Sequence, residues 1–310
     1  MPSLPKEKTV IKGEQSNRRV SIWGMNVADI AALIQLLRPL NCMMVGFAVL
    51  IGEVVVHKTL FPLPTLLGFV TGFSISGAAM VSNDYWDRKV DAANIPTRPI
   101  PSGKVKLGEA AVFTVLLSVT GLIAAYLTNL PSLLIASTGL VMFLLYNYRV
   151  KQLGLPGNML VSASIALPLL YGGVIHPQSS ASTHSLTLLV FFELMIFLAN
   201  TGREVNKGIS DIEGDKVRNI STVALKHGPR KAAQLSAILY LSGVALSPLP
   251  WLLNIVSWSY IPLVIVADLG LVASAFILLK DHSKENALKV KRMVLLWMLL
   301  GLLSFVAGAL

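Results

Sequence analysis

Carboxylates, an amide and cations crowd into residues 83–103, NDYWDRKVDAANIPTRPIPSG, between two apolar segments. If the preceding helix continues, Asn83, Asp87 and Asp91 fall at i, i+4 and i+8, and Asp84 lies on the same face. Like charges one turn apart repel each other, and more strongly where water is scarce, so three aspartates on one face require a counter-ion. Oxygen ligands suit a hard divalent cation, and we expect Mg²⁺.

A second polar block covers residues 203–215, REVNKGISDIEGD. A cation or a carboxylate stands at every fourth position, namely Arg203, Lys207, Asp211 and Asp215. On a helix these side chains form one stripe, which favours either mutual ion pairing or a second metal cluster. Asp87 precedes Asp211, and Asp91 precedes Asp215, by the same 124 residues. We interpret the two blocks as DxxxD pairs that face one cavity from the two halves of the molecule.

Further cations surround the two blocks. The proline-rich segment 95–103 ends the helix that carries the first block and should hold Arg98 and Lys104 close to the aspartates. Arg38 lies within an apolar run, where a guanidinium is costly unless it faces a wet, anionic cavity or snorkels to the interface. Tyr146 and Lys151 follow another apolar run and either anchor it at the interface or belong to the site.

The segments that must position these groups are apolar. Of 310 residues, 54% are hydrophobic and only 14% charged, and the mean hydropathy is +0.67. These values are typical of an integral membrane protein rather than a soluble domain, which has about 25% charged residues. Nine runs are long enough to cross a bilayer and predict an all-α bundle around a central cavity: 28–56, 62–82, 108–128, 131–147, 157–176, 185–201, 232–253, 257–279 and 290–310. We expect residues 27–310 to form one transmembrane domain.

The basic residues predict the orientation of this bundle. They gather in the N-terminal arm, residues 1–26, and in alternate loops, and only Lys58 falls in a loop on the other side. By the positive-inside rule the N-terminus is cytoplasmic, the C-terminus lies outside, and both polar blocks face the cytoplasm of a multi-pass cell-membrane protein. This topology accounts for most of the net charge of +10, so we expect no nucleic-acid partner. Nothing in the sequence indicates an obligate protein partner.

Two acidic clusters ringed by cations suit a polyanion bound through metal ions. A diphosphate fits, and the apolar bundle favours one with a hydrocarbon tail, an isoprenyl diphosphate. Metal ions would stabilise the negative charge on the leaving group. A cation transporter is the non-enzyme alternative, but it predicts acids throughout the bundle. Seven of the 16 acids instead lie in the two blocks: Asp84, Asp87, Asp91, Glu204, Asp211, Glu213 and Asp215.

The two blocks resemble the paired NDxxDxxxD and DxxxD signatures of the UbiA-type intramembrane prenyltransferase superfamily, and the nine-helix pattern extends the resemblance over almost the whole chain. The resemblance implies two Mg²⁺ ions and an allylic diphosphate that ionises before an acceptor captures it. It implies metal ligands at Asn83, Asp84, Asp87, Asp91, Asp211 and Asp215, with Asp87, Asp91, Asp211 and Asp215 as the catalytic set. The candidate substrate-binding residues are Arg38, Asn41, Arg98, Lys104, Tyr146, Lys151, Arg203 and Lys207.

Three segments resemble the archaeal ether-lipid branch of this superfamily: RPLNCMM, the first block, and GREVNKGISDIEGD. The implied reaction moves a geranylgeranyl group from its diphosphate to geranylgeranylglyceryl phosphate, a lipid-like phosphorylated acceptor. Because the loop of the first block is also similar to chlorophyll synthase-like members, an aromatic acceptor of a quinone or chlorophyll-type pathway stays open. Glu193 and Asp268, two acids within apolar runs, receive no role.

Overall fold

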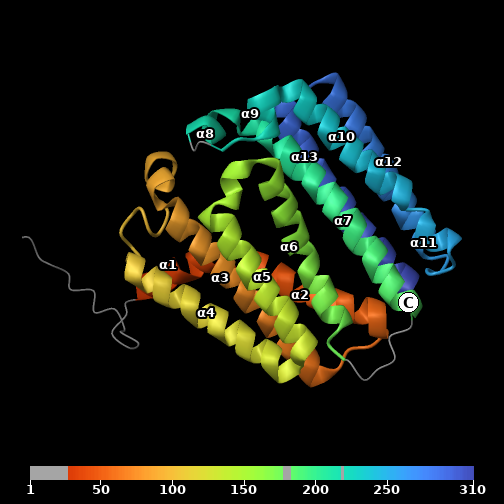
Figure 1. Ribbon diagram of the computed structural model, residues 1–310, viewed down its shortest axis with the longest axis horizontal. Helices are drawn as coiled ribbons and strands as arrows, with labels where there is room; N and C mark the ends of the chain where they lie inside the picture. Colours follow the sequence, from red (N-terminus) through yellow and green to blue (C-terminus); the bar gives the residue numbers. More distant parts are fainter. Residues whose placement is uncertain (1–26, 177–182, 218–219) are drawn as a thin grey trace, which may run out of the picture.

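The computed structural model describes residues 27–176, 183–217 and 220–310 and is built of helices (Figure 1). Nine of these helices are long and apolar enough to span a membrane: α2 (Pro39–His57), α3 (Pro62–Asn94), α4 (Leu107–Thr128), α5 (Leu130–Tyr148), α6 (Leu155–Gly173), α7 (Thr183–Ser210), α10 (Pro229–Leu246), α12 (Tyr260–Lys280) and α13 (Lys284–Ala309). Shorter helices lie between them: α1 (Val27–Leu37), the 3₁₀ helix η1 (Val150–Leu153), α8 (Ile212–Val217), α9 (Val223–His227) and α11 (Leu249–Leu252). The predicted nine-span bundle is confirmed for the described part of the chain, whereas the arm 1–26 lies outside it.

The first apolar run is divided where the sequence predicted one helix. Arg38 separates α1 from α2 with a left-handed backbone, φ 51° and ψ 64°. Pro39 has no N–H to donate to a preceding turn and disfavours helical geometry in the residue before it. A proline is well accommodated at the start of a helix, and α2 begins there.

The two longest of the described helices, α3 and α7, both carry a polar block at the end. At about 1.5 Å per residue, the 33 residues of α3 and the 28 of α7 extend over roughly 50 and 42 Å, against a hydrocarbon core of about 30 Å. The continuation of α3 through the first block is as predicted. In the second block the helix is interrupted at Asp211, after which α8 begins.

Helices α2 and α6 form the centre of the bundle. A Cβ on Gly52 of α2 would overlap the Leu169 carbonyl of α6, and a Cβ on Gly172 of α6 would overlap the Val49 carbonyl of α2. The two backbones are therefore in direct contact. Helices α3, α4 and α5 lie on one side of this pair, and α7, α10, α12 and α13 lie on the other (Figure 1). Helices α3 and α7 each pack against α2 but not extensively against each other in the described chain.

Candidate functional site

The ends of α3 and α7 that carry the polar blocks lie on the same side of the bundle. In Figure 1, α8 and α9 are at the upper edge, the end of α3 is at the upper left, and the C-terminus lies toward the lower right. The turn that joins α5 to α6 stands between the two polar ends. The same-side arrangement expected from the sequence is therefore present.

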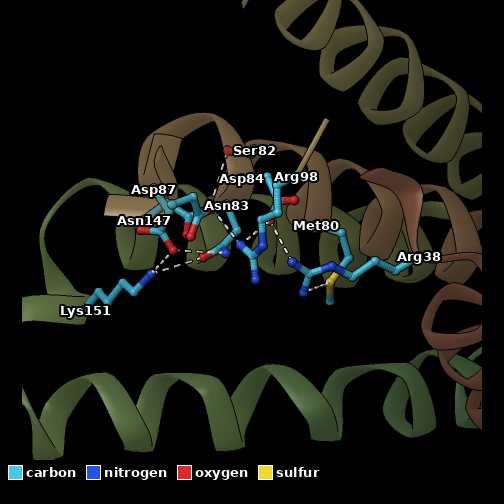
Figure 2. A network of polar contacts seen from close by, with 10 residues as sticks. Arg38, Met80, Ser82, Asn83, Asp84, Asp87, Arg98, Asn147 and Lys151 are labelled. Carbon is cyan, nitrogen blue, oxygen red and sulfur yellow. Dashed lines mark hydrogen bonds and ion pairs between the residues drawn. The ribbon is translucent and has the colours of Figure 1, made fainter. Parts of the chain in front are cut away.

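Two aspartates of α3 are held by arginines from separate segments (Figure 2). Arg38 Nη2 lies 2.7 Å from Asp84 Oδ1, and Arg98 Nη1 lies 2.6 Å from Asp91 Oδ2 and 3.4 Å from Asp84 Oδ1. Asp84 and Asp91 are almost completely buried. Because buried carboxylates need a compensating charge, these arginines are part of the local fold as well as of the polar surface.

At the other end of the network from Arg38, Asp87 and Asn83 contact a lysine (Figure 2). Lys151 Nζ, in η1, lies 2.5 Å from Asp87 Oδ2 and 3.4 Å from Asn83 Oδ1. Asn83 Nδ2 donates a hydrogen bond of 3.3 Å to Asp87 Oδ2. Two oxygens one helical turn apart thus converge on one positively charged group, so this pair of residues is arranged to bind a cation.

The second block forms ion pairs through Glu204, an acid that was not among the predicted site residues. Glu204 Oε1 lies 2.9 Å from Arg203 Nη1, and Glu204 Oε2 lies 3.4 Å from Lys207 Nζ. Asp211 instead accepts a 2.9 Å hydrogen bond from Ser210 Oγ, and Asp215 is buried. The spacing of Glu204, three residues before Lys207 and next to Arg203, was the signal that could have identified it.

The turn between α5 and α6 connects the two blocks. Ser221, which follows the second block, donates its backbone N–H to the carbonyl of Gln152, the neighbour of Lys151. Gly154 has φ 72°, and a Cβ there would overlap the Ser221 carbonyl oxygen. Only glycine combines this left-handed backbone with such a close approach. The position of Lys151 at the first block is therefore coupled to the loop that follows the second.

Comparison with known proteins agrees with this arrangement. The model of the UbiA prenyltransferase family matches residues 45–307. The chain belongs to this family. A protein of Methanosphaera stadtmanae named digeranylgeranylglyceryl phosphate synthase is 32% identical over 277 residues, which are 89% of this chain and 98% of that protein. An Archaeoglobus fulgidus protein of the same name is 35% identical over 297 residues, 94% of this chain and 99% of that one.

Solved structures of the family have the same fold. One described as digeranylgeranylglyceryl phosphate synthase superposes with a TM-score of 0.79 at 30% identity, over 91% of this chain and 98% of that one. A UbiA homologue from Archaeoglobus fulgidus bound to GPP and Mg²⁺ superposes with a TM-score of 0.63 at 17% identity, over 88% and 99%. The predicted family and fold class are confirmed, and this chain is a multi-pass membrane prenyltransferase.

Three further predicted site residues of this UbiA prenyltransferase lie at the surface or only partly inside the protein. Asn41 and Lys104 are exposed, and Tyr146 is partly buried in α5. The adjacent Asn147 instead donates a 3.4 Å hydrogen bond to Ser82 Oγ at the start of the first block. Asn147 lies near the end of α5, four residues before Lys151 in η1.

The oxygen groups of the first block fit a magnesium ion that also binds substrate. In the described chain, no three acidic, histidine or cysteine side chains are close enough together to enclose a metal on their own. Mg²⁺ commonly takes one or two carboxylates and completes its shell with water and substrate phosphates. The Asn83 and Asp87 oxygens supply a partial shell of this kind.

Other acids and cavities of this prenyltransferase lie away from the blocks. Asp268 Oδ2 accepts a hydrogen bond from Ser247 Oγ beside a small apolar cavity of about 40 Å³, and Glu193 lies beside α6, near the Leu170 backbone. A larger cavity of about 320 Å³ has Lys58, Asn254 and the C-terminal residues in its wall. The central cavity expected between the two motifs stays a prediction.

Proposed function

We propose that this chain transfers the geranylgeranyl group of geranylgeranyl diphosphate to geranylgeranylglyceryl phosphate. The observation that carries the proposal is the pair of charged blocks on α3 and α7, on one side of an apolar bundle and connected through the α5–α6 turn. The choice of acceptor is supported by relatives of 32 to 35% identity that bear the name of this activity and match almost their whole length.

In the proposed reaction, the bond between the allylic carbon of the donor and its diphosphate oxygen breaks, and diphosphate leaves with the electron pair. The free glycerol hydroxyl of the acceptor forms a new carbon–oxygen bond and loses its proton to the departing diphosphate. Arg38, Arg98 and Lys151 lie where they can donate to the diphosphate oxygens. The apolar interior of the bundle binds the hydrocarbon chain and keeps water from the allylic cation.

We assign Mg²⁺ to the residues of the two blocks: Asn83, Asp84, Asp87, Asp91, Asp211 and Asp215. When bound, the metal would supply positive charge to the leaving diphosphate. Of these residues, Asp87 and Asn83 both direct an oxygen at the ammonium group of Lys151. Asp84 and Asp91 hold Arg38 and Arg98, so their first contribution is to position the two guanidinium groups.

The test is the product formed by purified protein with geranylgeranyl diphosphate, Mg²⁺ and one acceptor at a time, identified by mass. We expect digeranylgeranylglyceryl phosphate. Prenylation of a hydroxybenzoate, a dihydroxynaphthoate or a chlorophyll-type ring, with none of the glyceryl phosphate, would replace the proposed acceptor. Cation uptake by proteoliposomes without any prenyl transfer would indicate the transporter alternative.

A further inference from the structure

A lysine outside both sequence motifs lies beside the second block. Asn206 Nδ2 of α7 donates a buried 3.1 Å hydrogen bond to the Ala287 carbonyl of α13. Lys291 is one turn further along α13 on the same face. Because the end of α7 meets the start of α13, the two helices run in opposite directions. Lys291 therefore lies level with the turn of α7 that contains Arg203.

The electrostatic surroundings of Lys291 agree with this position. Its ammonium group interacts with Lys207 and Arg203, which repel it, and with Asp211 and Glu204, which attract it. None of the ion pairs within 4.0 Å among the described residues includes Lys291. Lys291 is thus a partly buried cation close to other cations, without a carboxylate of its own.

The two blocks differ in how their cations are paired with carboxylates. At the first block three cations, Arg38, Arg98 and Lys151, face three carboxylates, and every carboxylate has an ion pair. At the second block Arg203 and Lys207 share the single carboxylate of Glu204, and Lys291 adds a third cation. Asp211 is the only other carboxylate with which Lys291 interacts. Immediately around Lys291, three cations, Lys291, Arg203 and Lys207, therefore stand with the two carboxylates of Glu204 and Asp211.

One hydrogen-bond donor at the second block also has no acceptor among the described residues. The Nε atom of Arg203 is buried and has no hydrogen-bond partner among the described residues, although its Nη1 atom pairs with Glu204. A buried polar donor without a partner is uncommon unless a ligand or water completes it. Guanidinium and ammonium donors that lie close together, one of them with an unused N–H, favour a phosphate group.

We propose that Lys291, together with Arg203 and Lys207, binds the phosphate group of the acceptor. The inference rests on the proposed function, in which the acceptor carries a phosphate monoester. The donor diphosphate is assigned to the first block and the metal ligands, so the cations between α7 and α13 serve a second, separate phosphate. Lys291 is accordingly a residue that selects a phosphorylated acceptor.

The experiment compares wild-type protein with Lys291→Met and Lys291→Arg. Loss of one charge-assisted phosphate contact should weaken binding of geranylgeranylglyceryl phosphate by about tenfold or more, measured without donor or Mg²⁺. The KM for this acceptor should rise by a similar factor, while the KM for geranylgeranyl diphosphate stays within about twofold. Lys291→Arg should restore much of the affinity because it keeps the charge. Lys289→Met is the matched control, since Lys289 is exposed on the same helix.

Geranylgeranylglycerol, which lacks the phosphate, distinguishes failure of the role proposed for Lys291 from failure of the proposed function. Lys291→Met should remove most of the wild-type preference for the phosphorylated acceptor over this alcohol. An unchanged preference, or a defect confined to the donor KM, would overturn the role of Lys291 and leave the proposed function intact. Wild-type protein that prenylates neither glyceryl acceptor would overturn both. Binding by Lys291→Gln is measured in parallel as a second neutral variant.

Discussion

At the residue scale, Asp91 illustrates how closely binding groups and folding are joined in this protein. Its side chain is 2% exposed, and among the described residues its salt bridge is with Arg98. A buried carboxylate that loses its partner retains the full cost of desolvation. Arg98 was selected from the sequence as a phosphate ligand, and in the structure it also stabilises the end of α3.

We therefore expect Arg98→Ala to destabilise the protein before any substrate is added. The expected loss is about 2 kcal/mol, a value reduced from that of a fully buried pair because 28% of the Arg98 side chain is exposed. Thermal unfolding in detergent provides the measurement. Adding Asp91→Asn to Arg98→Ala should recover part of the loss, and Lys207→Ala, with a side chain 43% exposed, should change stability little. Equal stability of wild-type and Arg98→Ala protein would contradict this account.

Asp87 and Asp211 should affect turnover rather than folding. Each is only partly buried. Asp87 binds Lys151 and Asn83 through Oδ2, and Asp211 binds Ser210 through Oδ1, so the second oxygen of each carboxylate can bind a metal. We expect Asp87→Asn and Asp211→Asn to abolish prenyl transfer while thermal stability stays near that of wild-type protein. Excess chelator should have the same effect on the wild type, and full activity in chelator would refute the assignment of Mg²⁺.

The residues of the first block could be placed from the sequence because helical spacing alone puts Asn83, Asp87 and Asp91 on one face. The ion-pair partners of these side chains could not be predicted from helical spacing. The Arg38–Asp84 pair joins residues 46 positions apart, and its geometry depends on the break before Pro39. The ion pairs of Glu204 compete with the expected Arg203 and Lys207 contacts to Asp211, and the sequence does not decide between them.

At the scale of the elements, apolar length was sufficient to predict the nine spanning helices. The interruptions at Arg38 and Asp211 are local events that length does not reveal. The role of the α5–α6 turn was also hidden, because the contact between Gln152 and Ser221 joins segments far apart in the chain. The run of Gly154, Pro156 and Gly157 was a visible sign of a turn there.

Gly154→Ala should reduce activity by displacing the loop after the second block. The added Cβ would overlap the Ser221 carbonyl and would also strain a left-handed backbone. Gly228→Ala is the control, because Gly228 has a similar φ of 85° but open space around its Cβ position. We expect both variants to lose some stability, and only Gly154→Ala to lose most of its kcat/KM. Equal activity of the two variants would exclude the proposed coupling between the turn and the site.

At the scale of the whole molecule, the expected orientation can be measured with single cysteines. Cys42 is the only cysteine and is fully buried, so wild-type protein should not react with a membrane-impermeant maleimide. We predict that Ser259→Cys is labelled in intact cells, because it should lie outside. Lys226→Cys, which is exposed near the polar blocks, should be labelled only after the membrane is permeabilised. The opposite pattern would place the active site outside the cell.

The backbone contact between α2 and α6 has a consequence for how this family can diverge. Helices with touching backbones cannot move closer together, and a single methyl group at Gly52 or Gly172 would force them apart. Because α3 and α7 pack against this central pair, the distance between the two helices that carry the motifs is fixed as well. Adaptation to a longer prenyl chain or a different acceptor must then proceed through side chains and loops. Homologues with different substrates should keep glycine at these two positions while the surrounding walls vary.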